Sequence, residues 1–167
     1  MNNSNAPAGQ TPGLLTGTET ALVAEVPGAG GRWSQVHFNQ EVMRRFFHLE
    51  RDNGRSITLE RIASDGTLQS RTSRQLVFST ANSNSKIEFD FDPLPRYPAG
   101  AERPLLVIVE ADYLTFRFRL VMPGNSGHEG LQELLSAGSS IGRGLRRRIA
   151  TLDDVEAYWP TAALRGA

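Results

Sequence analysis

The chain has 167 residues, enough for one domain with a substantial buried core. It contains no cysteine, which excludes disulfides, thiolate metal sites and a cysteine nucleophile and is typical of a cytoplasmic protein. Eighteen basic residues balance eighteen acidic ones, which argues against indiscriminate polyanion binding and leaves room for a locally basic, sequence-specific DNA-binding surface.

The amino terminus has neither the basic nor the apolar region of a signal peptide, and no apolar run is long enough to span a membrane. We therefore expect a cytoplasmic location and no membrane partner. Residues 1–20 are rich in Asn, Gly, Pro and Thr, a composition that predicts a disordered leader.

Apolar residues over 21–26 predict a first strand, and residues 32–38 a second. The glycine-rich stretch 27–31 between them suggests an antiparallel pair with a flexible tip. Asn39 can then cap a short helix from Gln40 to about Leu49. Four apolar residues of that segment recur at helical spacing and predict its buried face: Val42, Met43, Phe46 and Phe47.

Strands are expected over 56–62 and 67–73, joined by an Asp65-Gly66 turn. The chain then passes from an apolar strand end through a polar segment, Ser79 to Ser85, into the alternating stretch IEFDF. This alternation predicts that Ile87, Phe89 and Phe91 face a core. Lys86, the single lysine of the sequence, lies at the start of that strand.

Three prolines make residues 93–100 an irregular connection. The apolar run 105–109 predicts a strand buried on both faces. Alternation over 113–122 predicts another, with its phenylalanines inward and Arg117 and Arg119 outward. A short helix is expected over 127–137, and Thr151 to Asp154 matches a capping box that opens a last helical turn.

About seven short strands with two or three short helices predict a mainly β protein, an antiparallel barrel or a strongly bent sheet.

Motifs for catalysis are missing. Asn84 stands where an acidic-pair nuclease has an acid two residues before its lysine, and Ser85 before Lys86 excludes a phosphate-binding loop. No His-x-Lys pattern is present. Residues 138–142 have the Gly-x-Ser-x-Gly spacing, but they follow a predicted helix and not the strand that a nucleophile elbow requires. The sequence thus predicts no catalytic residue, no metal site and no cofactor.

The order of features resembles the B3-like DNA-binding domains of type II restriction endonucleases. The resemblance covers residues 21 to about 122 and rests on ALVAEV, PGAGGRWSQ, VHFNQEVMRRFF, TANSNSKIEF, PLLVIV and YLTFRFRLVMPG, in that order. It implies a seven-stranded open barrel over 21–137 that grips the major groove with two arms. Residues 138–167 would form a basic loop and a short helical segment packed on that barrel.

Carried over by position, the resemblance implies arms at 27–35 and 79–86. Asn, Arg, Lys and Ser chemistry suits base edges and phosphates independently of it. The implied DNA-binding residues are Arg32, Trp33, Ser34, Gln35, Asn82, Ser83, Asn84 and Lys86. Weaker phosphate contacts are expected from Arg44, Arg45, Arg71, Arg74, Arg146 and Arg147, the last two in a basic run that could equally be a solvated loop.

The sequence therefore predicts a non-catalytic module that binds double-stranded DNA sequence-specifically, as the recognition part of a restriction-modification system with its nuclease on another domain or subunit. This hypothesis requires both arms and Arg44, Arg45, Arg71 or Arg74 on one concave positive face, and it fails if the two arms lie at opposite ends of the barrel. The alternative is a protein-interaction or small-ligand β-barrel in which the arms are ordinary hairpin loops.

Overall fold

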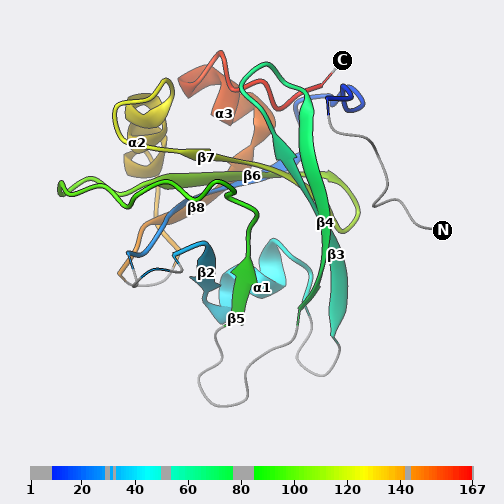
Figure 1. The fold of residues 1–167 in the computed structure, drawn as a ribbon, viewed down its shortest axis with the longest axis horizontal. Coiled ribbons are helices and arrows are strands. Elements are labelled where there is room, and N and C mark those ends of the chain that lie inside the picture. The colour runs from blue at the N-terminus through cyan, green and yellow to red at the C-terminus, as the bar shows by residue number, and fades with distance from the viewer. Residues whose placement is uncertain are drawn as a thin grey trace.

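The computed structural model describes residues 9–28, 31, 33–49, 54–76, 85–141 and 144–166. Within these ranges the protein is mainly β, with eight strands and three short helices (Figure 1). No helix in the described part of the chain is both long and apolar enough to cross a membrane.

Six strands form a mixed sheet in the order β4-β3-β7-β6-β1-β8. All neighbours are antiparallel except β3 and β7, which run parallel. The sheet crosses the middle of the view in Figure 1, and the long β3-β4 hairpin bends away from it. Its strands are β1 (Thr20–Glu25), β3 (Arg55–Ile62), β4 (Leu68–Leu76), β6 (Leu105–Asp112), β7 (Thr115–Val121) and β8 (Arg147–Thr151).

A separate two-stranded ribbon is formed by β2 (Gln35–Phe38) and β5 (Ser85–Glu88). It lies with the helix α1 (Gln40–Arg45) below the six-stranded sheet in Figure 1. Asn39 caps α1, since its side chain accepts a hydrogen bond of 2.9 Å from the amide of Val42. An aromatic core fills the space between ribbon, helix and sheet, and contains Phe38, Phe46, Phe47, Phe89, Phe91, Phe116 and Phe118.

The opposite face of the sheet is covered by α2 (His128–Ser136) and α3 (Leu152–Tyr158), which lie above it in Figure 1. Strand side chains alternate between the two cores. Leu22 and Ala24 of β1 pack toward the aromatic core, whereas Ala21 and Val23 pack toward the helices. Burial of β6 on both faces follows from this layering and confirms the prediction made for the apolar run 105–109.

Several predicted elements are confirmed. The Asp65-Gly66 turn joins β3 to β4, and Ile87, Phe89 and Phe91 are buried. The capping box is present, since the Thr151 side chain accepts from the amide of Asp154. The predicted α1 is correct in its start and buried face but ends at Arg45, before the predicted Leu49.

The predicted pairing of the first two strands is wrong. Both edges of β1 are occupied by β6 and β8, and β2 pairs with β5 instead. The basic run is also not a loop throughout, because Arg147 begins β8 and pairs with Ala24. Among the described strands no closed barrel is found, and β4 and β8 are the edges of an open sheet.

Both ends of the described chain pack on the sheet. Leu15 is buried, and its amide donates to the carbonyl of Arg165 at 2.7 Å. Residues 9–19 therefore differ from the predicted disordered leader. Arg117 is likewise buried rather than outward, because the terminal segments cover its face of β7 and accept hydrogen bonds from its guanidinium.

Candidate nucleic-acid interface

Both predicted arms are attached to the β2-β5 ribbon. Its antiparallel register pairs Gln35 with Glu88 at one end and Phe38 with Ser85 at the other. The first arm enters the ribbon at Gln35 and the second at Ser85, so the two arms join it at opposite ends. Three residue steps separate these points by about 10 Å along the ribbon, which is close to the width of a B-DNA major groove, about 12 Å.

One face of the ribbon points to solvent. Val36, Phe38 and Ile87 are buried beneath it, and the alternate residues His37 and Lys86 are exposed directly opposite one another. Aromatic packing fixes the buried side, since the Phe38 ring lies 5.5 Å from the ring of Phe47. The ribbon therefore presents polar side chains from a rigid support.

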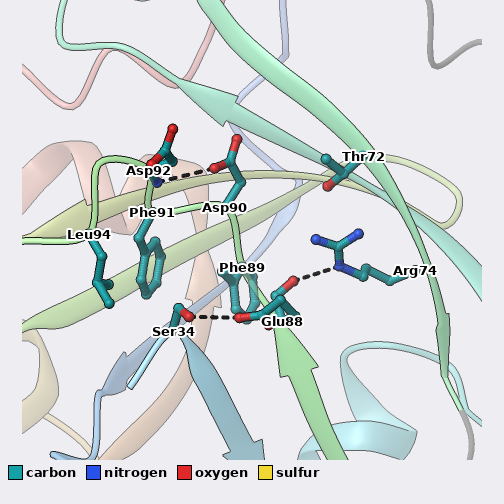
Figure 2. A pocket seen from close by; sticks show the side chains of 9 residues that line it. All are labelled: Ser34, Thr72, Arg74, Glu88, Phe89, Asp90, Phe91, Asp92 and Leu94. Carbon is teal, nitrogen blue, oxygen red and sulfur yellow. Dashed lines mark hydrogen bonds between the residues drawn. The ribbon is translucent and has the colours of Figure 1, made fainter. Parts of the chain in front are cut away.

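At the Gln35 end, polar side chains converge on one carboxylate. Ser34 donates to Glu88 Oε2 at 2.7 Å, and the Gln35 amide reaches Oε1 at 3.4 Å. Arg74 of β4 donates to the Glu88 carbonyl at 2.8 Å, which ties the ribbon to the edge of the large sheet. Figure 2 shows Ser34, Arg74 and Glu88 at a pocket that Phe89 also lines. The volume of this pocket is about 390 Å³.

Trp33 does not face this solvent side. Its side chain is only 3% exposed and lies against Phe91 and Tyr97, with ring centroids 5.5 and 5.4 Å apart. The indole anchors the end of the first arm to the aromatic core. We therefore leave Trp33 out of the proposed DNA-binding surface.

The predicted arginines are distributed over several surfaces. Arg44 and Arg45 are both exposed on α1, and Arg45 pairs with Glu41 at 2.7 Å one helical turn away. Arg71 instead contacts the buried carboxylate of Glu60, on the side of β4 opposite Arg74. Arg71 and Arg74 therefore do not share the single basic face that was predicted.

Arg146 and Arg147 are held by the protein itself. The Arg146 guanidinium contacts Glu25 and Gln132. Arg147 is 8% exposed, burial lowers the pKa of its guanidinium, and its Nη2 lies 3.4 Å from the carbonyl oxygen of His37. These contacts give both residues a structural role and connect β8 to the ribbon.

Two residues at the ribbon were not singled out from the sequence. His37 faces solvent across from Lys86, and Glu88 organises the end of the first arm. Period-two alternation around Val36 and Phe38 marks His37 as outward, but only the pairing with β5 places it beside Lys86. Four predicted contact residues lie outside the described ranges: Arg32, Asn82, Ser83 and Asn84.

No family model matches the sequence, and no curated protein matches it. A solved structure with a similar fold is the N-terminal domain of Helicobacter pylori LlaJI.R1. The two chains superpose with a TM-score of 0.53 over 78% of this chain and 97% of that chain, at 7% sequence identity. The likeness lies in the fold, and it spans nearly the whole of that bacterial domain.

Proposed function

We propose that this chain is a DNA-binding module of a restriction-modification system, specific for a sequence in double-stranded DNA. The observation that carries the proposal is the shared fold with the N-terminal domain of Helicobacter pylori LlaJI.R1. The resemblance of the sequence to the DNA-binding domains of restriction endonucleases supports it. A recognition domain of a restriction protein needs a surface for DNA and no catalytic machinery of its own, which agrees with the absence of the acidic-pair-plus-lysine and His-x-Lys nuclease motifs from the sequence.

In the proposed mechanism, the protein grips the major groove in the manner of the B3-like domains. Side chains from both arms and the ribbon contact base edges, and flanking arginines neutralise phosphates. From the described residues we assign base contacts to Lys86 and Gln35, and phosphate contacts to Arg44 and Arg45. Ser34 and Arg74 support the first arm through Glu88. Arg32, Asn82, Ser83 and Asn84 complete the proposed arms.

Cleavage in this proposal belongs to a separate nuclease domain or subunit. Binding by this chain alone should need no metal ion or nucleotide, because pairing to base edges and phosphates supplies the affinity.

The test is selection of bound duplexes from a random pool by the purified chain, followed by binding titrations at several salt concentrations. We expect one enriched sequence motif. Asn84→Ala should relax the preference at one base position, by about 1–3 kcal/mol for a bidentate contact. Arg96→Ala is the control, because Arg96 lies on the proline-rich connection outside the ribbon. A folded protein that enriches no sequence would contradict the proposal.

In that event the pocket beside β5 becomes the candidate site of a ligand-binding domain, since it places Arg74, Glu88 and Ser34 around an opening of about 390 Å³. Screening of small polar and aromatic compounds by thermal shift, with Arg74→Ala as the comparison, would then identify the ligand class.

A further inference from the structure

We propose that the solvent face of the β2-β5 ribbon recognises guanine in the major groove, with His37 and Lys86 as adjacent hydrogen-bond donors. This inference rests on the proposed DNA-binding function. It adds the base that the site prefers, and it assigns a specificity-determining role to His37.

The first observation is the position of the two side chains. His37 and Lys86 are register partners in the antiparallel ribbon, and both are exposed. Directly opposed residues have Cβ atoms about 4.5–5.5 Å apart, whereas successive bases on a DNA strand are about 3.4 Å apart. The two side chains can therefore reach one base or two successive bases.

The second observation is that both side chains are available. Within the described ranges, no hydrogen bond or ion pair engages the imidazole of His37 or the ammonium of Lys86, whereas Gln35 and Ser34 nearby both donate to Glu88. The backbone under the pair is nevertheless fixed, because Val36 and Ile87 are 1% exposed and Arg147 contacts the His37 carbonyl.

The chemistry of the pair selects the base. An ammonium group has three donors and no acceptor, and a histidine ring nitrogen that carries a proton is also a donor. In the major groove guanine presents two acceptors, N7 and O6, whereas adenine adds a donor and cytosine presents a donor. Two neighbouring donors on one rigid ribbon thus match the edge of guanine best.

Charge on the same face favours base edges over phosphates. Glu88 is two residues from Lys86 on the same strand, and its side chain lies on the same side of the ribbon. A carboxylate repels phosphate but accepts a hydrogen bond from the amino group of cytosine. The major groove is wide enough to admit a two-stranded ribbon, so this mixed face suits the floor of the groove.

The experiment compares motifs selected from random duplexes by the wild-type chain, Lys86→Ala and His37→Ala. We expect a guanine in the wild-type motif, and a preference for it that falls by about tenfold or more in each variant. His37→Asn should move the preference at one position toward adenine, because an amide side chain pairs with adenine N6 and N7. Gln69→Ala and Arg96→Ala, both outside the ribbon, should leave the motif unchanged.

Circular dichroism of each variant establishes that it is folded, as exposure of both residues predicts. Equal weakening of all sequences in Lys86→Ala and His37→Ala would indicate phosphate contacts and overturn the inference. An unchanged motif in both variants, or a wild-type motif without guanine, would overturn it while leaving the proposed function in place. Failure of the wild-type chain to enrich any sequence would remove both.

Discussion

Glu60 of β3 and Arg117 of β7 form a buried charge pair at neighbouring positions of the parallel strands, with Arg117 Nε 3.6 Å from Glu60 Oε1. Burial lowers the pKa of Arg117, and the charge of Glu60 opposes that shift. The same guanidinium donates to the carbonyls of Leu164 at 2.9 Å and Gly13 at 2.6 Å. A single side chain thus holds both terminal segments to the sheet.

Removal of the carboxylate should therefore destabilise the protein strongly. Glu60→Ala leaves the Arg117 charge buried without its partner, and loss of one member of a buried pair typically costs about 3–5 kcal/mol. Urea unfolding followed by circular dichroism measures the change. Glu41→Ala removes the exposed pair with Arg45 and should cost at most about 0.5 kcal/mol. Similar losses of unfolding free energy in both variants would show that the buried pair stabilises the protein no more than the exposed pair does.

The cap of α1 gives a second prediction. Asn39→Ala removes the acceptor for the Val42 amide and should lower the free energy of unfolding by about 1 kcal/mol. Asn39→Ser keeps an acceptor at this position and should recover most of the loss. Chemical denaturation of the three proteins measures the difference, and equal stability of the Ala and Ser variants would argue against a capping role.

Phe89 connects the ribbon to the aromatic core. Its ring is stacked with that of Phe91 at 5.9 Å and meets that of Phe118 edge-on at 5.1 Å. Phe89→Ala should cost about 3–5 kcal/mol of stability, as large-to-small core substitutions do. Phe89→Leu keeps most of the volume and should cost clearly less. Thermal unfolding ranks the two variants, and the prediction fails if they are equally stable.

Arg44 provides a test of phosphate contact. It is exposed on α1, and the proposed surface assigns it to the DNA backbone. Arg44→Ala should weaken binding to all sequences alike and reduce the slope of log K against log salt by about 0.9. Fluorescence anisotropy titrations over a salt series measure this slope. A changed sequence preference with an unchanged slope would instead place Arg44 at a base.

Acid stability should depend in part on Asp65. Hydrogen bonds from the hydroxyl and the amide of Thr67, at 2.6 and 3.0 Å, hold the pKa of Asp65 below its ordinary value. A lowered folded-state pKa means that this carboxylate stabilises the protein above its unfolded-state pKa, and that the contribution disappears as the pH falls through the folded-state value. The wild type should therefore lose more stability than Asp65→Asn between neutral pH and about pH 2. Equal losses in urea unfolding across this range would contradict the prediction.

Local patterns predicted the elements whose burial follows from their own sequence. The alternation of Ile87, Phe89 and Phe91 and the cap at Asn39 depend on neighbours within a few residues, and both are present. Strand pairing between segments that are distant in the sequence was harder to predict. Nothing in β1 indicates that β6 and β8 occupy both of its edges, so the expected pairing with β2 was wrong.

The burial of charged residues was the second feature that could not be predicted from the sequence. Arg117 alternates with phenylalanines and was expected to face solvent, but the terminal segments cover that face. At the candidate site, Lys86 could be proposed as a DNA contact from the sequence. Its neighbour His37 could not, because it is 49 positions away in the chain and only the pairing of β2 with β5 places it beside Lys86. Trp33 was predicted to contact DNA because it lies in the glycine-rich arm, but its side chain is part of the core.

The alternation along the ribbon has an evolutionary consequence. Val36, Phe38 and Ile87 hold it in place, and the positions between them contribute little to packing. Substitutions at His37 and Lys86 can therefore accumulate without loss of folding stability, so that related chains could diverge in the ligands they prefer while keeping one scaffold.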